Sequence, residues 1–262
     1  MKTSNATLET KKLLTIIVPY RKTMDPEREE NLDITLGYWS KTGIPNLVVS
    51  EHSDAPTKNL DTYTNLFESF QVVFTNANGG SFSQAKAINA GVIEANTPYI
   101  VLLDSDCLTK KKNINTSLSL LNKGYDVVHP FNRKVTDIVD KTTFKERYDF
   151  KIVKSRPQKR RWADGGIVFW NKHSFVVIGM ANEYFTGWGG EDNEVMMRAD
   201  LLNLKQYRIK DTLYHLYHYR PQKTTQKNIE QLQRMQHMTK YSCIQEINKW
   251  PWVTDAKKKF SY

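Results

Sequence analysis

The stretch "PYIVLLDSDCL" (Pro98–Leu108) carries an apolar run that stops at two aspartates, one on each side of Ser105. A short apolar run bounded by such breaks is typical of a strand that is buried on both faces. Ligands of open α/β sheets bind at the carboxyl ends of the strands, so Asp104 and Asp106 lie where a site is expected. The alternative is an ordinary loop that contains Asp-x-Asp.

Two carboxylates at this spacing repel each other unless a cation lies between them. Their hard oxygen atoms suit Mg²⁺ or Mn²⁺, and the oxygens of a diphosphate can complete the coordination shell. We therefore expect Asp104 and Asp106 to form a divalent-cation site in a nucleotide-binding crevice.

Similar apolar runs recur along the chain and alternate with amphipathic stretches. Further strands are predicted at residues 13–18, 46–50, 70–75, 125–130, 165–170 and 213–218, and helices at 83–95, 194–204 and 224–240. Ser83 is the expected N-cap of the first of these helices. The alternation predicts an open, mostly parallel α/β sheet in a single domain. The charged segment 134–161 is predicted to be a long surface excursion, and residues 249–262 a basic, aromatic tail.

The composition restricts the partners and the location of the chain. Its net charge of +10 favours an anionic partner, which includes nucleotide phosphates, nucleic acid and an acidic membrane surface. Its two cysteines, Cys107 and Cys243, show no metal-ligand spacing and are expected to be reduced thiols. No apolar run is long enough to cross a bilayer. We expect a cytoplasmic protein, with basic patches that allow peripheral contact at the inner membrane surface.

Two strand ends supply further candidate ligands for a nucleotide. Pro19, Tyr20 and Arg21 follow the first predicted strand, where the ring can stack and the guanidinium can pair with a phosphate. Glu51 ends the second predicted strand, where a carboxylate can accept hydrogen bonds from a base or a ribose. In each case an ordinary exposed strand exit is about as good an explanation.

Two histidines and a glycine-rich stretch complete the candidates. His215 and His218 lie three residues apart on a predicted strand, so at most one should point into a given site. A neutral imidazole can ligate Mn²⁺. In "FTGWGGED", the glycines allow close approach to a ligand, and Trp188 offers a face on which a sugar can stack. Glu191 and Asp192 either cap the following helix or act as catalytic carboxylates.

The order "PYR", "FSQAKAINAGV", "LDSD", "DGGIVFWNKHSF", "GWGGED" and His-x-Arg resembles the metal-dependent, inverting glycosyltransferases of the GT-A fold. The likeness is greatest to the galactosyl- and N-acetylgalactosaminyltransferases, the group of the beta-1,4-galactosyltransferases and the bacterial chondroitin-type polymerases. It covers roughly residues 13–221. It implies a Rossmann-like mixed sheet with helices on both faces.

The resemblance also implies a division of the chain and a role for each matching residue. A GT-A domain would span 1–221, with a nucleotide-binding half at about 13–130 and an acceptor half at about 162–221, before a helical, basic tail at 222–262. Asp106 would bind the metal directly, and Asp104 would hold the ribose or a metal-bound water. His218 matches the metal-binding histidine of the group, and His215 is the alternative.

The remaining implied roles concern the two substrates. Pro19, Tyr20 and Arg21 would line the pocket for uridine diphosphate (UDP), with Lys86 and Asn89 in the helix beneath it. Gly166 would present its backbone near the donor sugar, and Trp188 would lie beside both sugars. Glu191 would hydrogen-bond the acceptor, and Asp192 would be the general base.

These roles predict transfer of Gal or GalNAc, with Glc or GlcNAc as alternatives, from a UDP-sugar to a glycan or glycolipid hydroxyl. Mn²⁺ or Mg²⁺ would be the cofactor, and no nucleic-acid partner is expected. Two other functions remain open from the sequence: a nucleotidyl- or sugar-1-phosphate transferase of similar fold, and a basic nucleic-acid-binding protein.

Overall fold

The computed structural model describes residues 9–158, 163–187, 189–219 and 224–260. Its centre is a seven-stranded sheet with the order β10-β6-β9-β4-β1-β2-β3. The strands are β1 (Leu14–Tyr20), β2 (Asn46–Ser53), β3 (Ser69–Asn76), β4 (Tyr99–Leu103), β6 (Val127–His129), β9 (Ile167–Asn171) and β10 (Gln206–Arg208). β9 runs antiparallel to β4 and β6, whereas the other neighbouring pairs are parallel. The sheet is therefore mixed, as the resemblance implied.

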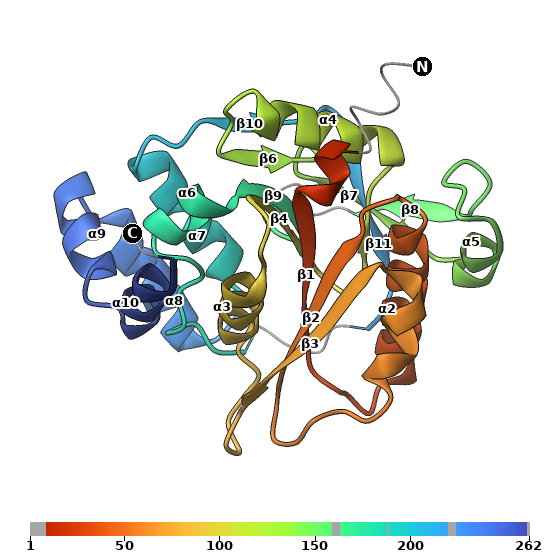
Figure 1. The fold of residues 1–262 in the computed structure, drawn as a ribbon, viewed down its shortest axis with the longest axis horizontal. Helices are drawn as coiled ribbons and strands as arrows, with labels where there is room; N and C mark the ends of the chain where they lie inside the picture. Colours follow the sequence, from red (N-terminus) through yellow and green to blue (C-terminus); the bar gives the residue numbers. More distant parts are fainter. Residues whose placement is uncertain (1–8, 159–162, 188, 220–223, 261–262) are drawn as a thin grey trace.

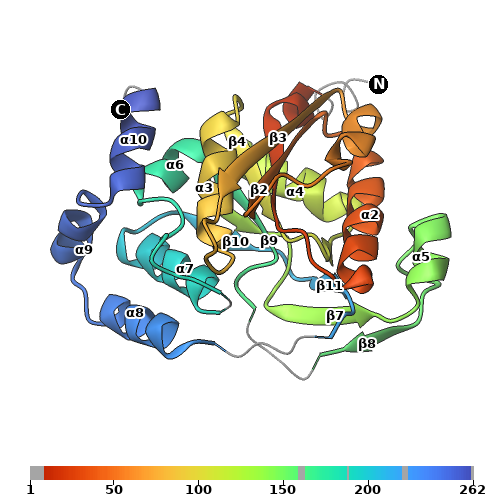
Figure 2. The ribbon, with the colours of Figure 1, turned by 90° about the horizontal axis from the view of Figure 1, so that it is seen from below.

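Helices cover both faces of this sheet (Figures 1 and 2). One face packs against α2 (Pro26–Ser40) and α4 (Lys111–Asn122), and the other against α3 (Gln84–Glu94), α6 (Lys172–Val177) and α7 (Glu191–Leu201). A short 3₁₀ helix, η1 (Leu60–Leu66), precedes β3. β1 is buried along its whole length, which explains its nearly continuous apolar sequence. Ser83 caps α3 through a bond from the Lys86 N–H, as predicted.

A second, four-stranded sheet lies beside the first, with the order β5-β11-β7-β8. Its strands are β5 (Cys107–Leu108), β7 (Lys134–Ile138), β8 (Ser155–Pro157) and β11 (Thr212–Leu216). β7, the helix α5 (Lys141–Arg147) and β8 come from the segment predicted to be a surface excursion. That prediction is wrong for β7 and α5, because Val135, Ile138 and Phe144 are buried in the main core, whereas β8 is exposed as predicted. This sheet joins the turn after β4 to the histidine segment.

The C-terminal segment forms three helices: α8 (Gln226–Gln236), α9 (Lys240–Ile247) and α10 (Pro251–Phe260). They lie against α3, α6 and α7, at the end of the molecule opposite α5 (Figure 2). Trp250 and Trp252 are buried in the same apolar cluster as α3, and the Trp252 indole N–H donates to the Gly179 carbonyl at 3.0 Å. The tail predicted as basic and aromatic is therefore a packed part of the domain.

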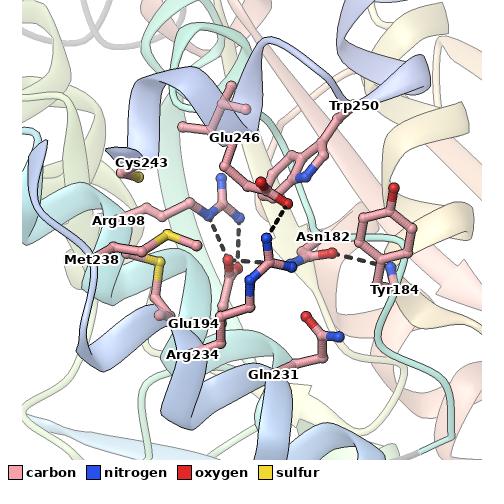
Figure 3. A pocket seen from close by; sticks show the side chains of 12 residues that line it. Asn182, Tyr184, Glu194, Arg198, Gln231, Arg234, Met238, Cys243, Glu246 and Trp250 are labelled. Carbon is pink, nitrogen blue, oxygen red and sulfur yellow. Dashed lines mark hydrogen bonds and ion pairs between the residues drawn. The ribbon is translucent and has the colours of Figure 1, made fainter. Parts of the chain in front are cut away.

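A pocket lies where α7, α8 and α9 meet (Figure 3). The buried Arg198 guanidinium binds both Glu194 oxygens at 2.8 Å and the carbonyls of Ile178 and Met180. It also lies over the Trp250 ring, 5.0 Å from the centroid. Glu194 and Arg198 lie one turn apart on α7, the helix that begins with Glu191. The contact of Arg198 with Trp250 therefore connects α7 to the C-terminal segment.

Candidate active site

Five elements, β1, α3, β4, β9 and α7, meet at one cavity at the carboxyl ends of β1 and β4. Pro19, Asp104, Gly166 and Asp192, all predicted site residues, line this cavity together with Asp164, Gln84 and apolar side chains. The Asp104 N–H donates to the Gly166 carbonyl at 2.9 Å, so the strand end and the glycine are directly joined. The cavity therefore brings together residues from both parts of the chain, 13–130 and 162–221.

The two aspartates lie in a tight turn directly after β4. The Cys107 N–H donates to the Asp104 carbonyl at 3.1 Å, and the Leu216 N–H donates to the Asp106 carbonyl at 2.8 Å. The Gln84 amide, in the first turn of α3, donates to Asp104 Oδ1 at 2.8 Å. These bonds hold Asp104 toward α3 and place Asp106 beside the end of β11.

Both histidines reach Asp106. Nε2 of His218 lies 2.9 Å from Asp106 Oδ2, and Nε2 of His215 lies 3.5 Å from the same oxygen. The expectation that at most one histidine faces the site is wrong. β11 ends at Leu216, so the alternation of a strand no longer applies at His218. Asp106, His215 and His218 thus form a cluster with three possible metal ligands.

The hydrogen bonds at Nδ1 identify the tautomer of each ring. Nδ1 of His218 lies 2.9 Å from the Tyr219 carbonyl, which can only accept, so this nitrogen carries the proton. Nδ1 of His215 lies 2.8 Å from Asp137 Oδ1. Burial raises the pKa of Asp137, but bonds from His215 and Gln158 outweigh this and lower it, so the carboxylate is ionised and accepts.

In neutral rings, both Nε2 lone pairs therefore point at one oxygen of Asp106. The two Nε2 atoms and Asp106 Oδ2 are then all electron-rich, and at separations of 2.9 and 3.5 Å from the oxygen they repel it. A cation bound between the three atoms would have each of them as a ligand. Two imidazoles and a carboxylate suit a transition-metal ion such as Mn²⁺, with Asp104 close by. The residues thus fit the divalent cation that the resemblance implies.

Glu191 and Asp192 begin α7, three residues before the predicted start of the helix. The N-cap is Gly190, with φ of 98°, and no side chain caps this end. Neither acid is the N-cap residue itself, but both charges lie in the first turn, near the positive end of the helix. Glu191 Oε2 is buried and has no hydrogen-bond partner among the described residues. A carboxylate oxygen left in this way is available to a ligand.

Burial raises the pKa of both carboxyl groups. The neighbouring charge of Asp104 raises the pKa of Glu191 further, and Glu191 and Asp164 raise that of Asp192. A carboxylate whose pKa is shifted toward neutrality is a stronger base than an ordinary aspartate. The Asp192 carboxylate also packs onto the Gly165 backbone, where a Cβ would lie 1.8 Å from Oδ2. The "DGG" sequence therefore makes room for it.

Asp164 is a site residue that was not predicted. Its carboxylate binds Arg208 at 2.6 Å, Arg133 at 3.2 Å and the Asn193 amide at 2.9 Å. It therefore ties the Gly165–Gly166 turn to the residue that follows Asp192. Its position directly before the double glycine was the signal in the sequence.

The predicted UDP-binding residues surround the ends of β1 and β2. The Tyr20 hydroxyl donates to Glu29 at 3.0 Å, and both oxygens of Glu51 accept from Thr57. Burial lowers the pKa of His52, and the charges of Lys86 and Arg21 lower it further. Lys86 of α3 and Arg21, directly after β1, therefore both bring positive charge toward this part of the site. The His52 ring accepts the Ser83 N–H at 3.1 Å.

Two other predicted features have different surroundings. The amide of the buried Asn89 binds Ala181 and Glu183, at 2.9 Å in each bond, so it connects α3 to the loop before α7. Trp188, and Arg220 of the His-x-Arg motif, lie outside the described residues, as do residues 159–161 of the predicted surface excursion. Among the described helices, none is long and apolar enough to cross a bilayer.

Comparison with known proteins agrees with this geometry. The family model described as "Glycosyltransferase like family 2" matches residues 29–208, more than half of the chain. The search of curated proteins gives no match. Among solved structures, the chain is similar to the catalytic domain of Drosophila beta1,4galactosyltransferase 7, with 19% identity and a TM-score of 0.53, over 86% of this chain and 81% of that one.

Two further structures share the fold. The similarity to S. aureus TarS has 14% identity and a TM-score of 0.56, over 95% of this chain and 72% of that one. The similarity to GalNAc-T7 has 13% identity and a TM-score of 0.59, over 94% and 53% of the two chains. The family match favours glycosyl transfer over the nucleic-acid-binding and nucleotidyltransferase alternatives. With its mixed sheet and its cavity at the carboxyl ends of β1 and β4, the chain is a glycosyltransferase of the GT-A fold and belongs to the glycosyltransferase-like family 2.

Proposed function

We propose that the chain transfers a hexose from a UDP-sugar to a hydroxyl of a glycan or glycolipid, with inversion and with Mn²⁺ as the cofactor. Gal or GalNAc is the favoured sugar, Glc or GlcNAc the alternative, and Mg²⁺ the alternative cation. The observation that carries the proposal is one cavity lined by Asp104 and Asp192, beside the cluster of Asp106 and two histidines.

The solved neighbours support the choice of substrates. One Drosophila beta1,4galactosyltransferase 7 structure contains manganese, UDP-Gal and xylobiose, and the GalNAc-T7 structure contains UDP, GalNAc and Mn²⁺. In the present chain, Asp106, His215 and His218 offer ligand atoms that suit the same ion. Arg21 and Lys86 bring positive charge to the end of β2, where it can stabilise a diphosphate.

The proposed reaction is one displacement. The acceptor hydroxyl oxygen attacks the anomeric carbon from the face opposite UDP, and the bond from that carbon to the phosphate oxygen breaks. Asp192 takes the hydroxyl proton, and Glu191 holds the acceptor through its unpaired oxygen. Asp106, His215 and His218 would hold the cation, which stabilises the charge on the departing diphosphate. No covalent intermediate with the protein is needed.

The proposal is tested by UDP release from a panel of UDP-sugars, with Mn²⁺ and with EDTA. We expect Mn²⁺-dependent release from UDP-Gal or UDP-GalNAc, and its loss in EDTA. Asp106→Asn should lose metal-dependent UDP binding, whereas Asp61→Asn, an exposed aspartate of η1, should bind as the wild type does. If no UDP-sugar were consumed with Mn²⁺ or Mg²⁺, the proposed function would be wrong.

A further inference from the structure

Asp137 belongs to a part of the chain that the proposed reaction does not use. It lies on β7, opposite His215 in the parallel pairing of β7 with β11. Its carboxylate is 6% exposed and the His215 ring 3% exposed, and Oδ1 lies 2.8 Å from His215 Nδ1. A buried carboxylate is thus in direct contact with the ring nitrogen that points away from Asp106.

Two neighbours hold the Asp137 carboxylate in place. The Gln158 amide donates to Oδ1 at 2.6 Å, and a nitrogen of Arg156 lies 3.8 Å from Oδ2. Both residues belong to β8 or follow it directly, so the antiparallel pair of β7 and β8 supplies the carboxylate and the groups that hold it. Arg156 also lies over the ring of Tyr217, a residue that stands between His215 and His218 in the sequence.

His218 is oriented differently. Its Nδ1 proton goes to the carbonyl of the adjacent Tyr219, a backbone contact that no side-chain substitution removes. His215 depends on a side chain from another strand. The two imidazoles of the cluster can therefore be perturbed separately.

We propose that Asp137 is a positioning residue that makes His215 the second imidazole ligand of the cation site and thereby favours Mn²⁺ over Mg²⁺. Asp137 keeps the proton on Nδ1, so the Nε2 lone pair stays directed at the site. Imidazole ligands suit transition-metal ions, whereas Mg²⁺ prefers oxygen ligands and retains its waters. This inference rests on the proposed function, because it requires a divalent cation at Asp106.

The test measures Mn²⁺ binding with UDP present and without turnover, by loss of the electron paramagnetic resonance signal of free Mn²⁺. Competition with Mg²⁺ gives the preference between the ions. The variants are Asp137→Asn, His215→Gln and the double variant. Glu146→Gln, an exposed acid on α5 between β7 and β8, is the matched control. Thermal unfolding without metal shows whether each variant is folded.

Asp137→Asn should weaken Mn²⁺ binding by about 10- to 100-fold, the usual effect of losing a residue that orients a metal ligand. His215→Gln should reduce the preference for Mn²⁺ over Mg²⁺. In the His215→Gln background, Asp137→Asn should have no further effect, since Asp137 acts through His215. Glu146→Gln should bind as the wild type does.

Wild-type Mn²⁺ affinity in Asp137→Asn, or additive losses in the double variant, would overturn the inference. A wild-type chain that binds no Mn²⁺ would overturn it as well. Failure of the proposed function would be recognised separately, as normal Mn²⁺–UDP binding without consumption of any UDP-sugar.

Discussion

Replacing Gly165 with alanine should displace the Asp192 carboxylate. The added Cβ would lie 1.8 Å from Asp192 Oδ2, whereas Cβ atoms in proteins essentially never approach other heavy atoms within 3.0 Å. The carboxylate must therefore move by about 1.2 Å. Gly165 has no positive φ, so alanine adds no backbone strain and the contact alone causes the effect.

A displacement of about 1 Å at a reacting group costs on the order of 10²-fold in rate. We expect the kcat of Gly165→Ala for UDP release to fall by about that factor, with Mn²⁺–UDP affinity unchanged. Overpacking should also lower the free energy of unfolding by about 1–3 kcal/mol. Turnover at varied UDP-sugar concentration, calorimetry of Mn²⁺–UDP binding and urea unfolding measure the three quantities.

The control is the same substitution in an Asp192→Ala chain, which lacks the carboxylate. There Gly165→Ala should cost little stability, because the colliding atoms are gone. Wild-type kcat in Gly165→Ala, or equal destabilisation in both backgrounds, would refute the packing of Asp192 against Gly165.

The other predictions concern stability. Arg198→Met leaves the Glu194 charge buried and should cost about 3–5 kcal/mol in urea unfolding, whereas Arg234→Gln, at a half-exposed pair with Glu246, should cost about 0–1 kcal/mol. Equal losses of stability in the two variants would contradict the inference that the buried Glu194–Arg198 pair stabilises α7. Ser83→Ala should cost about 1 kcal/mol through the lost α3 cap, and no change would disprove that cap. Burial, and then the charge of Arg208, hold the pKa of His129 well below its usual value, so its ring stays neutral in the fold. Below about pH 6.5 the unfolded chain takes up the proton, and the wild type should lose up to about 1.4 kcal/mol per pH unit relative to His129→Gln. If the free energies of unfolding of the wild type and of His129→Gln changed with pH in the same way, this account of His129 would be contradicted.

The buried strands of the main sheet could be predicted because burial on both faces requires nearly continuous apolar sequence, whereas the short edge strand β10 has no buried residue and was not predicted. β1 and β4 are the clearest cases. The helix α2 was not predicted, since it buries Asn31 and Thr35 beside Leu32 and Trp39. Its apolar periodicity is correspondingly weak. The Asn31 side-chain amide donates to the Leu216 carbonyl at 3.0 Å, a contact that only the fold reveals.

The candidate site shows the same limit. The positions of Asp104 and Asp192 at one cavity follow from motifs with a known order. The roles of Asp137 and Asp164 depend on contacts between distant segments, and the charge of Asp137 argued against placing it on a buried strand. The joint approach of the two histidines depends on where β11 ends, which side-chain alternation alone does not predict.

The central claim is that Asp192 is the base of a metal-dependent sugar transfer. The most direct test compares kcat for UDP release from the preferred UDP-sugar between the wild type and Asp192→Asn, with Mn²⁺–UDP affinity measured in parallel. We predict equal affinity and a kcat lower by about two to four orders of magnitude in the variant. Equal kcat at equal affinity would contradict the claim.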